Sequence, residues 1–238
     1  MLTLRSSLFW IGAALSAVLV FLLALFTVPL PFALRYRVIS CWARFNLWWL
    51  KICCRLNYQL EGAENLPQRS AIVLCKHQST WETLALQDIL PPHTWILKRE
   101  LLRIPVFGWG LALLNPVAID RTAGRKALDQ LIEQGSERLD AGCWLVIFPE
   151  GTRRPPGQKG SYRIGGAMLA HKSGHPVVPV AHNAGSYWPR HGFTLKPGTI
   201  TIAIGPVIES TDRSATEINE LTEAWIENRM KTLERPAS

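Results

Sequence analysis

The chain begins with a long apolar helix pattern and then changes to shorter apolar runs that alternate with polar positions. Between Arg5 and Arg35 no residue is charged, and residues 8–28 are almost entirely apolar. A helix of this length crosses about 30 Å of hydrocarbon at about 1.5 Å per residue. The run is long for a cleaved signal peptide, and no small-x-small cleavage site follows it. It predicts a membrane segment, either a full span or a re-entrant hairpin broken at Pro29 and Pro31, with a buried core helix as the alternative.

A second helix pattern covers residues 36–60 and carries a basic stripe. Its basic residues are spaced by seven, seven and four, which places them on one narrow helical face: Arg37, Arg44, Lys51 and Arg55. Tryptophans and other apolar residues lie beside this stripe and on the remaining faces. Such a helix fits a membrane interface with anionic headgroups, and an amphipathic helix packed on the domain is the alternative. The apolar segment directly before it favours the membrane interpretation.

After residue 60, short β-branched runs alternate with helix patterns. We expect strands at 71–75, 94–97, 117–119, 144–148, 177–181 and 199–204, and helices at 81–88, 106–114, 124–141, 164–172 and 215–233. This alternation predicts an α/β fold with a mixed, largely parallel sheet flanked by helices. The chain is therefore expected to have two parts, membrane-anchoring helices in residues 1–60 and an α/β domain in residues 61–238.

The net charge of +8 is concentrated near the N-terminus. Residues 1–60 hold six basic residues and no acidic one, whereas the rest holds 20 basic and 18 acidic residues. A near-neutral body argues against nucleic acid, because binding to a phosphate backbone requires a basic surface. The five cysteines lack a C-x-x-C repeat and predict reduced thiols in a cytoplasmic body. His171 and His175 have a zinc-like spacing but no acidic partner in the motif, so we expect a surface or packing role.

An imidazole precedes a carboxylate by five positions directly after the expected strand at 71–75. His77 can act as a base near neutral pH, and the carboxylate of Glu82 can fix its tautomer and stabilise the imidazolium. The stretch from Ser79 to Glu82 also fits a helix capping box, in which Glu82 binds only backbone N–H groups. The spacing alone is compatible with both interpretations.

Two further polar groups follow expected strands. Asp120 and Arg121 follow residues 117–119, and the run from Phe148 to Arg153 follows another strand. Ligands of parallel sheets bind at the carboxyl ends of the strands, so these groups are expected near His77. The Arg153 guanidinium is suited to a phosphate, and a surface turn with an ion pair is the alternative.

Four blocks of the sequence occur in the order found in the glycerolipid acyltransferases. They are His77 with Glu82, Ile119 to Arg121, Phe148 to Arg153, and Val177 to Val180, and the stretches Lys98 to Leu101 and Ile104 to Trp109 are also similar. Over roughly residues 71–180 the chain resembles bacterial 1-acyl-sn-glycerol-3-phosphate acyltransferases of the PlsC type. Its N-terminal helix patterns resemble the membrane-anchoring region of that family. The family usually has Asp where this chain has Glu82. Glutamate adds one methylene, and its carboxylate can still reach the imidazole after a small shift of the backbone or rotamer.

The resemblance implies transfer of a fatty acyl group to the sn-2 hydroxyl of lysophosphatidic acid, giving phosphatidic acid. The donor is a thioester on acyl carrier protein or coenzyme A, with His77 as the base and Glu82 as its orienting acid. The implied substrate-binding residues are Lys98, Arg121, Glu150, Gly151, Thr152 and Arg153. No cofactor and no metal are implied.

The same resemblance and the N-terminal charge pattern imply location at the inner, cytoplasmic membrane with the catalytic domain facing the cytoplasm. Another lysolipid, such as a lyso-ornithine lipid, is the alternative acceptor. A membrane-bound lipid hydrolase is the alternative activity, but the sequence lacks the G-x-S-x-G nucleophile motif.

Overall fold

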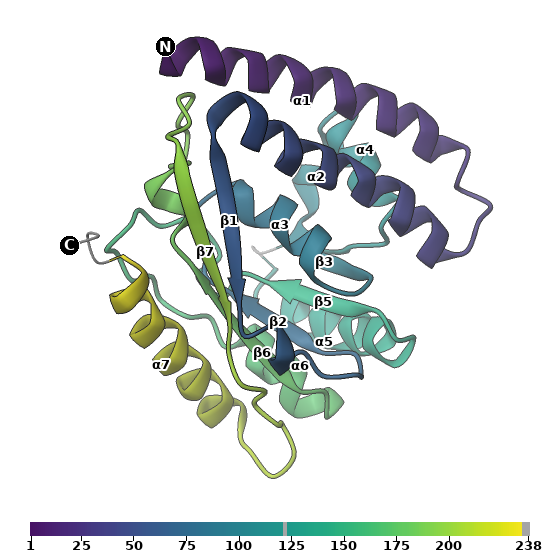
Figure 1. The fold of residues 1–238 in the computed structure, drawn as a ribbon. Coiled ribbons are helices and arrows are strands. Elements are labelled where there is room, and N and C mark those ends of the chain that lie inside the picture. Colours follow the sequence, from purple (N-terminus) through teal and green to yellow (C-terminus); the bar gives the residue numbers. More distant parts are fainter. Residues whose placement is uncertain (121–122, 235–238) are drawn as a thin grey trace.

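The computed structural model describes residues 1–120 and 123–234, and within them seven strands form one sheet in the order β1-β7-β6-β2-β5-β3-β4 (Figure 1). The strands are β1 (Leu56–Glu61), β2 (Ile72–Cys75), β3 (His93–Lys98), β4 (Val117–Ile119), β5 (Trp144–Ile147), β6 (Val177–His182) and β7 (Gly198–Ile204). Neighbouring strands are parallel except for the antiparallel pair β6 and β7. The predicted α/β fold with a largely parallel sheet is confirmed.

Helices cover both faces of this sheet (Figure 1). The helices of the body are α3 (Trp81–Ile89), α4 (Phe107–Ala112), α5 (Arg125–Asp140), α6 (Gly165–Ser173) and α7 (Ala215–Leu233). Strand β2 lies between two hydrophobic cores. Val73 and Cys75 belong to the core shared with α3, whereas Ile72 and Leu74 belong to the core shared with α5 and α6. Alternate side chains of a strand point to opposite faces, so β2 is buried on both sides and its end is held rigidly.

The N-terminal helix α1 (Leu2–Leu25) has one packed face and one exposed face. Phe9 meets Trp188 edge-on with ring centroids 5.4 Å apart, and Gly12 lies so close to Trp49 that a Cβ there would clash. The opposite face exposes an apolar stripe formed by Leu4, Leu8, Ile11, Leu15, Leu19 and Leu22. Among the described residues, α1 is the one helix long and apolar enough to cross a membrane, as judged by length and composition.

The next helix, α2 (Phe32–Cys54), is shorter than the predicted helix over residues 36–60. It ends where Arg55 adopts a left-handed conformation with a φ of 55°. The following residues form β1, which pairs in parallel with β7 from Leu56 opposite Gly198 onward. The prediction of a helix to residue 60 is therefore wrong, because a partner about 140 residues away in the sequence holds this segment as a strand. The division of the chain at residue 60 stays a prediction.

The basic stripe on α2 is exposed, but the tryptophans of this helix have different surroundings. All four basic residues are exposed: Arg37, Arg44, Lys51 and Arg55. Trp42 and Trp49 donate their indole N–H groups to carbonyl oxygens of α1, those of Ala13 and Leu8. Trp48 is 54% exposed beside the stripe. The two helices lie side by side (Figure 1), and indole hydrogen bonds contribute to holding them together.

His93 is a buried histidine that connects β3 to α2, with its Nδ1 3.0 Å from the hydroxyl oxygen of Tyr36. Burial lowers the pKa of His93 from 6.5 to about 4. Below pH 6.5 the unfolded chain binds a proton that the folded protein does not, so stability of about 3 kcal/mol is lost as the pH falls toward 4. We expect His93→Gln to remove this part of the fall in Tm between pH 6.5 and 4. Parallel Tm curves for the two proteins, measured by thermal unfolding, would contradict the assignment.

Candidate active site

His77 lies in the loop between β2 and α3, at the carboxyl edge of the sheet. Its backbone is held from both sides by the loop that follows β5. The N–H of His77 donates to Glu150 Oε2 at 3.1 Å, and its carbonyl accepts the N–H of Arg154 at 2.8 Å. The imidazole stacks on Phe148 with ring centroids 3.9 Å apart and an interplanar angle of 15°. These contacts fix both the backbone and the ring of His77.

The buried carboxylate of Glu82 contacts both the imidazole and the start of α3. Its Oε1 lies 2.7 Å from His77 Nδ1, and its two oxygens accept the N–H of Ser79 at 3.0 and 2.9 Å. Ser79 Oγ in turn accepts the N–H of Trp81 at 3.1 Å. One carboxylate therefore binds both the ring and a backbone N–H group at the start of α3, so Glu82 does not bind backbone alone, and its catalytic role stays a prediction. With the Nδ1 proton directed at Glu82, Nε2 carries the lone pair.

A second histidine lies behind this carboxylate. His182 Nε2 is 3.7 Å from Glu82 Oε2 and donates to the carbonyl of Lys76 at 2.9 Å, while its Nδ1 accepts the N–H of Ala184. Burial lowers the pKa of His182. Burial by itself raises the pKa of the Glu82 carboxyl, but the interactions with His182 and His77 outweigh burial and leave this pKa below its ordinary value. Sequence analysis missed His182, although a polar residue ending an apolar strand was an available signal.

A cavity of about 200 Å³ opens beside His77. Its apolar walls include Leu84, Trp95, Phe107 and Leu111. Lys98, from the end of β3, and Arg153, from the loop after β5, also line it. The Nε of Arg153 is buried without a hydrogen-bond partner in the described structure, and Lys98 lies 3.6 Å from Glu100. The cavity thus combines a base, an apolar wall and two cations, one of which has an unused donor.

The remaining predicted residues occupy other positions. Glu150 is buried behind His77, where its carboxylate binds Lys76 Nζ at 3.0 Å, and it does not line the cavity. Gly151 has a φ of 67°, which favours glycine, and its N–H closes a turn onto the Phe148 carbonyl. Thr152 is half-buried in the same loop. Arg121 lies outside the described residues. The functional roles of these residues stay predictions.

The two histidines with zinc-like spacing bind other groups. His171 Nδ1 lies 2.9 Å from the Arg213 carbonyl, and His175 Nε2 lies 3.9 Å from Asp140. Within residues 1–120 and 123–234, no group of three or more His, Cys, Asp and Glu side chains is arranged to hold a metal ion.

The geometry defines a class of enzyme. A base with a free Nε2 can remove a proton from a hydroxyl, and the same imidazole can then protonate a leaving group. Among the residues at the cavity, none combines a serine or cysteine nucleophile with this base. Such an arrangement can activate an acceptor hydroxyl for direct attack on an acyl carbon, the chemistry of a transferase.

The comparisons with known proteins identify this transferase more closely. The chain belongs to the acyltransferase family, whose model, described as "Acyltransferase", matches residues 57–183. A 1-acyl-sn-glycerol-3-phosphate acyltransferase from Pseudomonas aeruginosa is 46% identical over 232 residues, covering 95% of this chain and 90% of the relative. One from Saccharomyces cerevisiae is 28% identical, covering 77% of this chain and 62% of the relative.

The crystal structure of the 1-acyl-sn-glycerophosphate acyltransferase PlsC from Thermotoga maritima has the same fold. Its TM-score is 0.83 at 27% identity, covering 99% of this chain and 97% of that chain. The predicted resemblance is thereby confirmed, and the protein is an acyltransferase.

Proposed function

We propose that this enzyme transfers a fatty acyl group from a thioester to the sn-2 hydroxyl of lysophosphatidic acid, forming phosphatidic acid. The names of the relatives state that those proteins acylate 1-acyl-sn-glycerol 3-phosphate, which is lysophosphatidic acid. The observation that carries the proposal is that His77 shares one cavity with apolar walls and with the cations Lys98 and Arg153. Lysophosphatidic acid has a hydroxyl for the base, an acyl chain for the walls and a phosphate for the cations.

In the proposed reaction His77 Nε2 removes the hydroxyl proton as the oxygen attacks the thioester carbonyl carbon. The 2.7 Å contact between Nδ1 and Glu82 stabilises the imidazolium that forms. When the tetrahedral intermediate collapses, the C–S bond breaks and the imidazolium returns the proton to the departing sulfur. The oxyanion requires a donor. The N–H groups of Ser79 and Trp81 are already bonded, so we propose the backbone N–H of Thr80, a residue that lines the cavity.

The acceptor and donor are tested by incubating the purified protein in detergent with labelled acyl thioesters. Acyl-coenzyme A and acyl carrier protein are the two donors, and lysophosphatidic acid and a lyso-ornithine lipid are the two acceptors. We expect labelled phosphatidic acid. Acylation of the lyso-ornithine lipid alone supports the alternative acceptor, and free fatty acid without acylated product supports a hydrolase.

Replacing Arg153 by Ala should raise KM for lysophosphatidic acid by about 10- to 100-fold, because a charge-assisted hydrogen bond contributes about 1.5–3 kcal/mol. KM for the acyl donor should change little. Steady-state kinetics with each substrate varied in turn measures both constants. Lys172→Ala, which removes an exposed cation on α6, is the matched control. An effect confined to the acyl donor would exclude a phosphate-binding role for Arg153.

We also propose that α1 and α2 anchor the enzyme at the cytoplasmic face of the inner membrane. The exposed apolar stripe of α1 and the exposed basic stripe of α2 support this location. Trp42 of α2 also lines the cavity, which supports a reaction site beside the proposed anchor. A cysteine introduced by Lys172→Cys in a Cys41→Ser background should react with an impermeant maleimide in inverted membrane vesicles and not in spheroplasts. The reverse labelling would contradict the orientation.

A further inference from the structure

Helix α7 and its C-cap residue Glu234 lie beyond the residues matched by the family model, yet carboxylates of this segment reach the residues on either side of His77. Glu227 Oε1 lies 2.9 Å from Lys76 Nζ, and Glu234 Oε1 accepts the side-chain N–H of Gln78 at 2.7 Å. Glu227 lies within α7, and Glu234 is the residue directly after its last turn. Helix α7 and the residue that caps it thus contact both neighbours of the proposed base.

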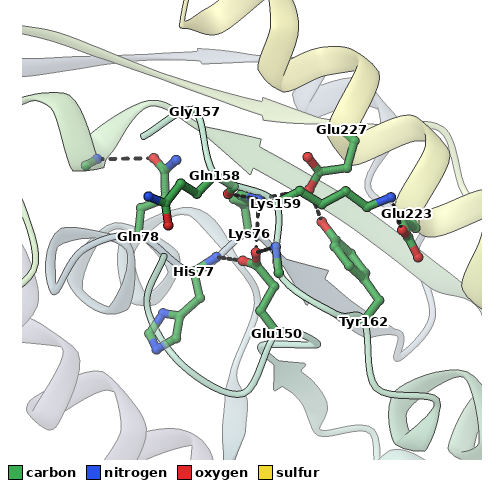
Figure 2. A network of polar contacts seen from close by, with 12 residues as sticks. Lys76, His77, Gln78, Glu150, Gly157, Gln158, Lys159, Tyr162, Glu223 and Glu227 are labelled. Carbon is green, nitrogen blue, oxygen red and sulfur yellow. Dashed lines mark hydrogen bonds and ion pairs between the residues drawn. The ribbon is translucent and has the colours of Figure 1, made fainter. Parts of the chain in front are cut away.

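Lys76 is the centre of this arrangement (Figure 2). It is 1% exposed, and its ammonium group binds Glu150 Oε1 at 3.0 Å, Glu227 Oε1 at 2.9 Å and the Gln158 carbonyl at 3.3 Å. Three acceptors match the three protons of an ammonium group. A buried ammonium is unfavourable without such partners, so the positions of both carboxylates depend on one another.

Glu150 connects Lys76 to the backbone of His77 in the candidate active site. Its Oε2 accepts the backbone N–H of His77, and its Oε1 also accepts the N–H of Gly160 at 2.9 Å. Figure 2 shows the imidazole of His77 pointing away from Lys76, whereas its backbone N–H faces Glu150. The contacts therefore reach the main chain that carries the ring and leave the ring free for its reaction.

The carboxylate of Glu227 is itself oriented by Tyr162, whose hydroxyl donates to Oε1 at 2.8 Å. Burial and the charge of Glu227 raise the pKa of Tyr162, which therefore remains a donor. Glu227 is thus held in one position, between a phenol and an ammonium group.

We propose that Glu227 is a positioning residue for acyl transfer, which acts through Lys76 and Glu150 on the backbone of His77. The proposal rests on the proposed function only because its test measures kcat and KM for acyl transfer to lysophosphatidic acid. Glu227 does not line the cavity beside His77, so its replacement is expected to change the alignment of the imidazole and to leave the residues of that cavity in place. Misalignment of a reacting group by about 1 Å is sufficient to reduce a rate about 10²-fold.

The test compares Glu227→Gln with Glu223→Gln. Glu223 lies one turn earlier on α7 and pairs with Lys159 (Figure 2), so its removal deletes an α7 ion pair that includes neither Lys76 nor Glu150. We expect kcat to fall about 10- to 100-fold in Glu227→Gln, with KM for both substrates within about twofold of wild type. Glu223→Gln should keep the wild-type kcat. Equal kcat values in the two variants overturn the proposal.

Two further measurements separate positioning from stability and from the identity of the substrate. If Glu227→Gln does not fold, the folded Glu227→Asp variant should show a several-fold lower kcat at unchanged KM, and a wild-type kcat overturns the proposal. The ring signals of 15N-labelled His77, recorded without substrate, should shift in Glu227→Gln and not in Glu223→Gln. Unchanged signals overturn positioning, whereas a shift in an enzyme that does not acylate lysophosphatidic acid refutes only the proposed function.

Discussion

Replacing His77 by Ala should reduce kcat for acyl transfer by about 10²- to 10⁴-fold, the range that a positioned general base contributes. In the proposed reaction the Nε2 of this ring is the base at the cavity, and Phe148 and Glu82 hold the ring in one orientation. Without the ring, the acceptor hydroxyl keeps its proton as it attacks the thioester. Single-turnover kinetics with saturating lysophosphatidic acid measures the loss directly.

The control for His77→Ala is membrane association, which should remain at the wild-type level because α1 and α2 are untouched. Flotation with phosphatidylglycerol vesicles measures it. Thermal unfolding shows that the variant is folded at the assay temperature. A folded variant with near-normal kcat would refute the proposed role of His77.

Replacing Glu82 by Gln should reduce kcat on the order of 10⁴-fold, a scale typical of replacing the orienting carboxylate of a histidine base by an amide. The amide has one oxygen in place of two, but His77 Nδ1 and the Ser79 N–H both require an acceptor. If the amide nitrogen faces the ring, the proton of the imidazole moves to Nε2 and the base is lost. If it faces the helix, the start of α3 loses its cap. Kinetics and thermal unfolding of the same variant separate the two results.

Glu82→Asp is the matched variant, because it keeps the charge and shortens the side chain by one methylene. We expect it to retain activity within about tenfold of wild type, since a small shift of α3 restores the contact.

The pKa of Glu82 is lowered in the folded protein, so its contribution to stability is present above its ordinary pKa and is lost as the pH falls through the folded value. Gln lacks this dependence. Full activity of Glu82→Gln would mean that the carboxylate only caps the helix.

Local patterns were sufficient to predict most elements of the body. Residues 215–233 were expected as a helix and form α7 with these bounds, and residues 117–119 form β4 as expected. Alternation of β-branched and polar positions reports burial of a strand, and a 3.6-residue period reports one buried helical face. Both patterns are properties of a single segment, so they can be recognised without knowing which segments it packs against.

The candidate site was predicted to the extent that its residues follow strands. His77, Lys98 and Arg153 follow or end three adjacent parallel strands, β2, β3 and β5, and the structure places them at one cavity. The order of the strands in the sheet cannot be predicted from the sequence of any one segment. It results from the pairing of residues that are distant in the sequence, and only the folded chain displays it.

The sequence by itself determined that this chain has an apolar N-terminal helix, an α/β body and a histidine with a carboxylate at the end of a strand, because each is a short-range pattern. Tertiary structure decided that residues 56–61 form a strand and that Trp42 and Trp49 pack on α1. It also decided that Glu227 meets Lys76 across 151 positions of sequence. A charge on an amphipathic helix has the same local pattern whether it faces solvent or a buried ammonium group, so only the folded chain distinguishes the two.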